Sequence, residues 1–229
     1  SPSVEYMVTL KNGTETRIRS AAMLPDVSTI QSIAEPIVNL EVIMPTPYLG
    51  AVMDFVGTIR SQYLRTDYIG TETALLEYKV PLAEVITDFY DRLKSVSSGY
   101  ASMSYEPSGF QTGDLVRLDI IVAEDLVEPF SKIIPRQDAS RQGRALVEKL
   151  KTVIPQQLFA VALQAVIGGK VIARETISAR RKDVTGYLYG GDVTRKMKLL
   201  KKQKRGKARM KESGRVNIPH EVFLEMLKK

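Results

Sequence analysis

The chain has 229 residues, enough for two small hydrophobic cores, and its composition excludes several classes of protein. Hydrophobic residues make up 44% of it, which is too much for an intrinsically disordered protein, and no apolar run is long enough to form a transmembrane helix. The absence of cysteine excludes disulfides and thiolate sites, and a single histidine excludes multi-histidine metal sites. The chain begins Ser1-Pro2-Ser3, without an initiator methionine or a signal-peptide pattern, so we expect a piece of a longer protein.

The net charge of +7 is distributed unevenly along the chain. Residues 1–173 carry 16 Lys and Arg against 20 Asp and Glu, a net charge of −4. Residues 174–229 carry 17 against 6, a net charge of +11. An acidic body with one basic end predicts an anionic partner for that end, either a nucleic acid or an anionic membrane surface.

The first 20 residues predict a β-hairpin. Residues 4–10 and 16–19 alternate apolar and polar side chains, and Asn12-Gly13 between them is a strong short-range turn signal. Residues 21–34 are rich in small and polar residues, and we expect a linker with one helical turn there.

Residues 35–108 show strand and helix signals in the order β-α-β-β-α-β. Branched apolar runs predict the strands, and each of two prolines begins a helix with one apolar face. The predicted elements are strands at 37–44, 63–69, 74–80 and 100–105, with helices beginning at Pro47 and Pro81. This order is the split β-α-β unit of the ferredoxin-like fold, so we expect the α+β class.

Residues 109–229 predict a second, smaller α+β domain. Both faces of 159–167 are largely apolar, which indicates a central strand, and Asp138 can cap a helix that ends before Pro155. The predicted elements are strands at 116–122, 159–167 and 171–177, a helix after Asp138, a basic helical segment, and a short capping helix at 218–227.

The basic C-terminal segment is the candidate binding site for an anionic partner. Between Arg195 and Arg215 there are eleven Lys and Arg in 21 residues and one acid, Glu212. On a helix these cations surround most of the circumference, so the isolated segment should fray until a polyanion neutralises it through counterion release. Lysine-rich contact positions a phosphate backbone without reading bases. The candidate RNA-binding residues are Arg180, Arg181, Lys182, Arg195, Lys196, Lys198, Lys201, Lys202, Lys204, Arg205, Lys207, Arg209 and Lys211.

Other interpretations stay open. A solvated charged helix would interleave acids, which this segment does not, and a membrane-surface helix needs a broader apolar face than Met197, Leu199, Leu200 and Met210 provide. A free-standing RNA-binding domain that assists ribosome assembly is a further alternative.

The sequence shows no combination of a nucleophile, a general base and metal ligands that would predict an active site. It has no glycine-rich phosphate loop, so we predict no catalytic residue, metal, cofactor or small-molecule substrate within this chain. Glu124, Asp125 and Glu128 could bind a hard cation in a hydrolase, but a solvated acidic loop is the simpler interpretation. We interpret the lone His220 as a surface or half-packed residue.

Several long stretches closely resemble the C-terminal domain of the LepA translational GTPases, also called elongation factor 4. These stretches are RALVEKLK at 144–151, IGGKVIARET at 167–176, YGGDVTRK at 189–196 and KLL at 198–200. PLAE at 81–84 and GYAS at 99–102 resemble the preceding domain, which is shared with elongation factor G. The similarity begins at about residue 34.

The resemblance implies a C-terminal fragment of such a GTPase. Its parts would be a hairpin and linker from the upstream domain at 1–34, a domain like domain V of elongation factor G at 35–108, and the LepA-specific domain at 109–229, with a basic tail at 192–229. GTP and Mg²⁺ would bind an N-terminal domain that this chain does not include.

The resemblance also implies partners, a role and a location. The expected partners are the ribosome, through its RNA and proteins, and tRNA. The expected roles are back-translocation or remodelling of stalled ribosomes, or support of initiation and subunit assembly. The expected location is the cytoplasm, on ribosomes and at the periphery of the inner membrane, with a mitochondrion or plastid as the second choice.

Three positions depart from the family pattern. The family often has a histidine within 135–138 and a cysteine at Leu188, and it commonly has a Lys-Arg-Gly-like turn where residues 59–62 read Ile-Arg-Ser-Gln. We therefore do not transfer that loop's ribosomal contacts to this chain. Tyr187 and Tyr189 are candidates either for base stacking or for packing.

Overall fold

The computed structural model describes residues 4–180, 193–213, 216 and 218–227, with side chains for all of these except 207–213 and 227. It divides into two compact units, Ser1–Leu115 and Val116–Lys229. Among the described residues, none of the helices has both the length and the hydrophobicity that a membrane span requires.

Unit 1 begins with the predicted hairpin. Strands β1 (Tyr6–Leu10) and β2 (Glu15–Ile18) pair antiparallel. At the turn, Asn12 Oδ1 accepts a hydrogen bond from the Thr14 amide at 2.9 Å, and Gly13 has a φ of 84°, which glycine adopts readily. The hairpin prediction is confirmed.

The predicted linker is shorter than the sequence indicated. It contains two 3-10 turns, Ala21–Met23 and Val27–Thr29, and strand β3 (Ile30–Pro45) starts directly after the second. The early start has a tertiary cause, because β1 pairs with the first residues of β3 and so continues the sheet.

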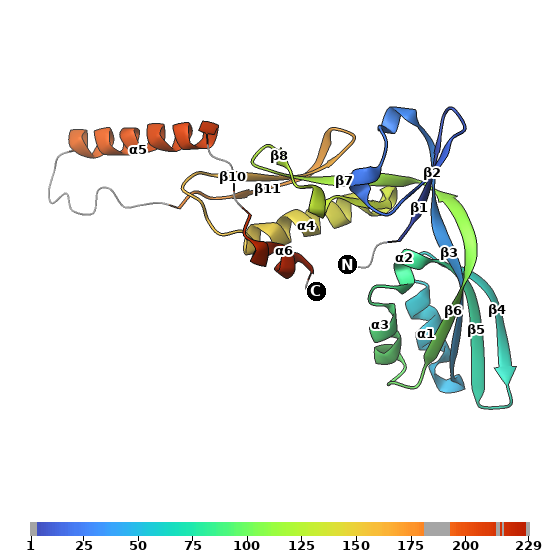
Figure 1. Ribbon diagram of the computed structural model, residues 1–229. Helices are drawn as coiled ribbons and strands as arrows, with labels where there is room; N and C mark the ends of the chain where they lie inside the picture. Colours follow the sequence, from blue (N-terminus) through green and yellow to red (C-terminus); the bar gives the residue numbers. More distant parts are fainter. Residues whose placement is uncertain (1–3, 181–192, 214–215, 217, 228–229) are drawn as a thin grey trace. The chain divides into compact units, whose positions relative to one another are not determined.

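The rest of unit 1 has the ferredoxin-like arrangement (Figure 1). Its further elements are α1 (Leu49–Val56), β4 (Gln62–Ile69), β5 (Thr73–Pro81), α2 (Leu82–Val85), α3 (Phe89–Val96) and β6 (Ser102–Gly113). The strands pair antiparallel in the order β6-β3-β5-β4, and α1 and α3 cover one face of the sheet. The predicted β-α-β-β-α-β order and the α+β class are confirmed.

The core of unit 1 lies between this sheet face and the helices. Leu40 and Val42 of β3 are fully buried, and the rings of Phe55 on α1 and Phe89 on α3 lie 5.0 Å apart. The predicted second helix is divided into α2 and α3, and the break falls at Thr87, a weak helix former.

A buried ion network joins three segments of unit 1. The Arg60 guanidinium, in the loop after α1, donates to both carboxylate oxygens of Glu35 on β3, at 2.5 and 3.0 Å. Its Nε donates to Glu84 of α2 at 2.8 Å. Glu35 is only 5% exposed. Burial alone would lower the pKa of Arg60, but hydrogen bonds and charge from Glu35 and Glu84 raise it above its usual value, so the guanidinium stays protonated.

The hairpin lies close to this network. Burial raises the pKa of Tyr6 on β1 to about 12, and the negative charge of Glu35 adds to the effect while Arg60 opposes it. The neutral phenol is therefore the form that the folded unit favours.

Unit 2 is a five-stranded sheet covered by a helix. The elements are β7 (Leu115–Val122), β8 (Asp125–Leu126), β9 (Lys132–Pro135), α4 (Ala139–Val153), β10 (Val161–Ile167) and β11 (Lys170–Ile177). The order is β11-β10-β7-β8, with β9 also on β7, so β10 is internal as predicted. Helix α4 approaches the sheet closely at Gly143, where a Cβ would lie 3.0 Å from Ile172 and 3.1 Å from Ala165.

Asp138 occupies the position before α4, as predicted, but it does not cap the helix with its side chain. Its carboxylate instead accepts from Arg141 Nη2 at 2.7 Å, and its backbone is already in the helical region, with φ −89° and ψ −10°. The preceding 3-10 turn, Arg136–Asp138, leads directly into α4 and accounts for this.

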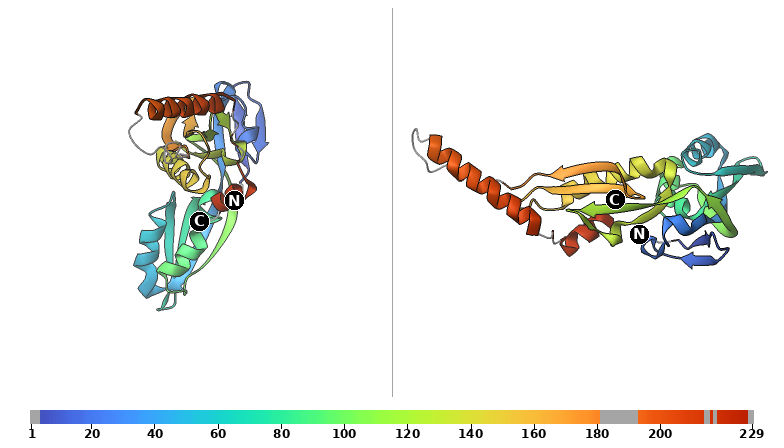
Figure 2. Two further views of the ribbon diagram at one scale, coloured as in Figure 1. Left: turned by 90° about the vertical axis from the view of Figure 1, so that its left-hand side faces the viewer. Right: turned by 90° about the horizontal axis from the view of Figure 1, so that it is seen from above.

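Two helices complete unit 2. Helix α5 (Val193–Ser213) is a single uninterrupted helix in both views of Figure 2. Helix α6 (His220–Leu227) returns to the core, where Val222 is buried and Phe223 stacks on Phe130 with ring centroids 5.0 Å apart. The predicted capping helix is confirmed.

We predict that Arg60→Ala destabilises unit 1 by about 3–5 kcal/mol, because it leaves the buried Glu35 carboxylate without its partner. Urea unfolding followed by circular dichroism measures this free energy. The control is Arg65→Ala, which removes an exposed ion pair with Glu77 and should cost much less. Equal losses from the two variants would contradict the importance of the network.

We also predict that the stability of unit 1 decreases as the pH rises from about 10 to about 12. Because the folded-state pKa of Tyr6 is raised, the unfolded chain loses this proton first, and the stabilisation present below pH 10 disappears through that window. Unfolding free energies of the parent and of Tyr6→Phe at several pH values isolate the effect. The variant should show a smaller decrease, and parallel curves would contradict the prediction.

Candidate nucleic-acid interface

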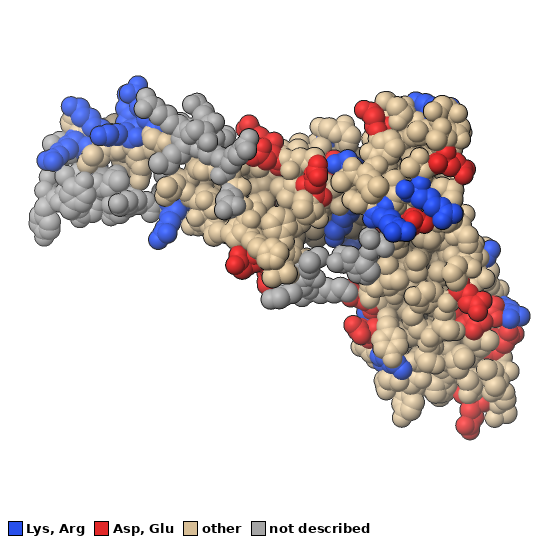
Figure 3. All heavy atoms as spheres, viewed as in Figure 1, with Lys and Arg blue, Asp and Glu red and all other residues tan. Residues whose placement is uncertain are grey.

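Helix α5 carries most of the candidate RNA-binding residues. Its 21 residues include ten Lys and Arg and one acid, Glu212. Lysine, arginine, leucine and methionine are good helix formers, and no proline interrupts the segment, so local propensity favours the helix despite charge repulsion. Figure 3 shows Lys and Arg side chains gathered on α5.

The structure places the predicted residues in three groups. Eight are described and exposed: Arg180, which follows β11, and Arg195, Lys196, Lys198, Lys201, Lys202, Lys204 and Arg205 on α5. Three more belong to α5, but their side chains lie outside the described part: Lys207, Arg209 and Lys211. The positions outside the described residues are Arg181, Lys182, Tyr187 and Tyr189. The backbone amide of Arg180 donates to the Gln157 carbonyl at 2.7 Å.

Some cations elsewhere in unit 2 have carboxylate partners within the fold. Arg117 donates to Asp119 at 2.7 Å, and Lys151 donates to Glu175 at 2.7 Å, which lowers the pKa of Glu175. Helix α5 has one carboxylate of its own for ten cations. Most of its charge therefore needs counterions or an external anion.

The basic segment is attached to the core of unit 2 at both ends. Before it, Ile177 at the end of β11 is buried in the core. After it, Val216 and Ile218 pack against the same core and lead into α6, whose Val222 is buried. These contacts make the basic segment a loop held at two points.

The acidic loop does not form a metal site. Ala123 and Glu124 have positive φ angles of 49° and 74° in a tight turn between β7 and β8. Within the described part of the chain, no three carboxylate or histidine side chains are grouped so that they could hold a metal ion. This gives no support to the hydrolase alternative around Glu124–Glu128. His220 is exposed at the start of α6.

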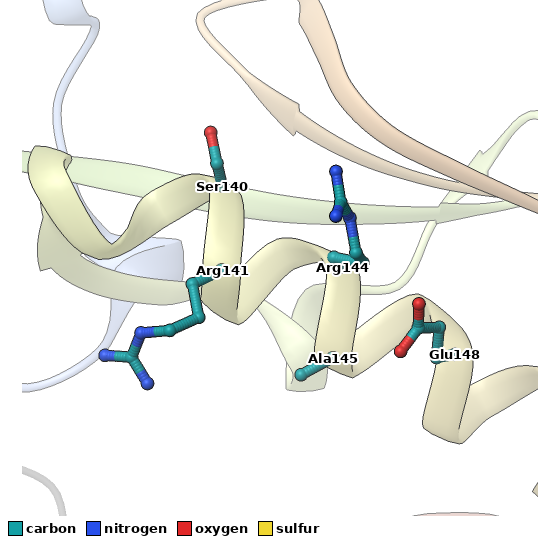
Figure 4. Close-up of a pocket in the computed structure, with 5 residues that line it drawn as sticks. All are labelled: Ser140, Arg141, Arg144, Ala145 and Glu148. Carbon is teal, nitrogen blue, oxygen red and sulfur yellow. The ribbon is translucent and has the colours of Figure 1, made fainter.

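A surface hollow of about 480 Å³ lies on α4 (Figure 4). Its lining residues are Ser140, Arg141, Arg144, Ala145 and Glu148. All five come from a single helix, Arg141 is paired with Asp138, and Glu148 contributes a negative charge. The hollow is therefore a depression of the helix surface and has neither the enclosure nor the charge of an anion-binding pocket.

Two family matches cover most of the chain. The family described as "Elongation factor G C-terminus" matches residues 32–121, and the family described as "GTP-binding protein LepA C-terminus" matches residues 122–228. The first match contains the ferredoxin-like strands and helices, and the second contains α4, α5 and α6. Together these features define the C-terminal region of a translation elongation factor.

Comparison with individual relatives also points to elongation factor 4. The chain is 48% identical over 228 residues to elongation factor 4 of Sulfurimonas denitrificans and of Campylobacter jejuni subsp. jejuni serotype O:2. The alignments include 100% of this chain but only 38% of each relative. A crystal structure of a protein from Thermus thermophilus aligns with 35% of this chain and with 12% of the chain in that crystal structure. The sequence identity is 27% and the TM-score is 0.33, which is too slight a similarity to support an assignment.

The chain belongs to the elongation factor 4, or LepA, family, and it corresponds to the C-terminal part of those proteins.

We predict that Gly206→Ala increases the helicity of α5. A Cβ at Gly206 would meet nothing within 4 Å, and glycine in a helix interior costs about 0.5–1 kcal/mol relative to alanine. Far-ultraviolet circular dichroism of the full chain measures the change. Gly206→Pro leaves the charge unaltered and should reduce the helical signal, and a gain in signal for proline would contradict the helical assignment.

Proposed function

We propose that this chain is the ribosome- and tRNA-binding C-terminal part of a translational GTPase and performs no chemistry itself. The observation that carries the proposal is α5, an exposed helix with ten cations and one acid in a member of the elongation factor 4 family. The ribosome and tRNA both present dense phosphate charge, the chemistry that such a helix attracts.

The physical basis of binding is counterion release. Each phosphate neutralised by Lys or Arg contributes about −0.7 to −0.9 to the slope of log affinity against log salt. Lysine-rich contact carries no base readout, so the chain recognises RNA by charge and shape.

In the whole protein, GTP and Mg²⁺ bind a region outside this chain and GTP hydrolysis takes place there. The chain itself engages ribosomal RNA and tRNA during elongation, in back-translocation or in remodelling of stalled ribosomes. The site of action is the cytoplasm, on ribosomes.

We predict that the chain co-sediments with purified ribosomes at low salt and is released as salt rises. The informative variant replaces α5, residues 193–213, with a Gly-Ser linker of equal length and keeps α6, because α6 packs in the core of unit 2. It should lose at least about tenfold in affinity and most of the salt dependence. Thermal unfolding of the variant checks that unit 2 still folds.

Three outcomes would contradict parts of the proposal. Unchanged ribosome binding by the linker variant would remove α5 from the interface. Stronger partition to phosphatidylglycerol vesicles than to ribosomes would replace RNA with an anionic membrane surface as the partner. GTP hydrolysis by the purified chain would contradict the absence of chemistry in it.

A further inference from the structure

The cations of α5 are arranged with a regular period. Arg195, Lys198, Lys202 and Arg205 follow one another at spacings of three, four and three residues. Because α5 is one uninterrupted helix, residues at these spacings are neighbours on a single face. We call these four residues the cationic stripe. Arg209 continues the same spacing along the helix.

Helix geometry gives the stripe its dimensions. At 3.6 residues per turn and 1.5 Å per residue, its four members lie within an arc of about 80° and extend along about 15 Å of the helix axis. All four residues are exposed. A straight row of cations of this kind matches the linear charge of one phosphate backbone.

Three apolar residues lie on the opposite side of α5, where Lys204 also lies and Lys196 flanks them. Val193, Met197 and Leu200, which we call the apolar stripe, follow at spacings of four and three residues and are 67%, 65% and 47% exposed. By the same geometry their mean direction lies about 155° from the centre of the cationic stripe. The arc of the cationic stripe contains cations and no apolar residue, whereas the opposite arc combines Lys204 with the three apolar residues.

We propose that α5 binds RNA in one orientation, with the cationic stripe along a phosphate backbone and the apolar stripe turned away. This inference rests on the proposed function, since it specifies how the same helix engages its partner. Turning the apolar stripe toward phosphates would place three apolar side chains against them and bring fewer cations into contact than the cationic stripe does. A helix with its side chains is about 10–12 Å across, so cations on the far side lie about one Debye length from the phosphates and are screened.

The matched lysines of α5 test this orientation. Lys198→Gln/Lys202→Gln removes two charges from the cationic stripe, and Lys196→Gln/Lys204→Gln removes two charges that lie about 140° from its centre. All four lysines are exposed, both variants lose the same charge, and glutamine resembles lysine in helix propensity. Binding of the full chain to purified ribosomes and to a fluorescein-labelled RNA hairpin, measured across a salt series, is the readout.

The stripe variant should lose at least about tenfold in affinity at low salt, and its salt slope should fall by about 1.5. The other variant should lose no more than about threefold and largely keep its slope. Circular dichroism of both confirms that α5 keeps its helicity.

Equal losses in the two variants, or a greater loss in Lys196→Gln/Lys204→Gln, would overturn the orientation while leaving RNA binding by α5 intact. Failure of the unmodified chain to bind either probe would overturn the proposed function, and the orientation with it.

Discussion

Concentrated positive charge is the constraint on which the organisation of this chain depends. In the folded units several cations lie beside carboxylates, as in the pairs Arg60–Glu35 and Lys151–Glu175. Helix α5 has ten cations and a single acid, and such a segment cannot be buried against a hydrophobic core because the cost of desolvating so many like charges is too high. The charge is therefore confined to an exposed helix, and the sheets and remaining helices form the scaffold that holds it.

Local sequence signals were sufficient for most of the fold. The Asn12-Gly13 turn and the prolines that begin two helices gave the hairpin and the β-α-β-β-α-β order. The features that local signals did not predict depend on tertiary contacts. The early start of β3 at Ile30 depends on pairing with β1, and the contact of Arg60 with Glu35 joins residues 25 positions apart, which periodicity cannot reveal.

The candidate interface was predictable in composition but not in geometry. A run of eleven Lys and Arg between Arg195 and Arg215 identifies a basic segment in any conformation. The row of cations without apolar neighbours in its arc exists only if the helix is continuous from Val193 to Ser213. The attachment of the segment at its far end also needed the structure, because the packing of Phe223 on Phe130 joins distant parts of the chain.

Helix α6 therefore anchors the C-terminal end of the basic segment to the core of unit 2. With Val222 buried and Phe223 stacked on Phe130, the basic segment is a closed loop; without them it would be an arm fixed at one end only. A closed loop samples fewer positions and keeps its cations at a higher effective concentration near the body of unit 2. Apolar residues packed in the core thus limit how far the basic helix reaches, and a change in α6 alters that reach without altering any cation of α5.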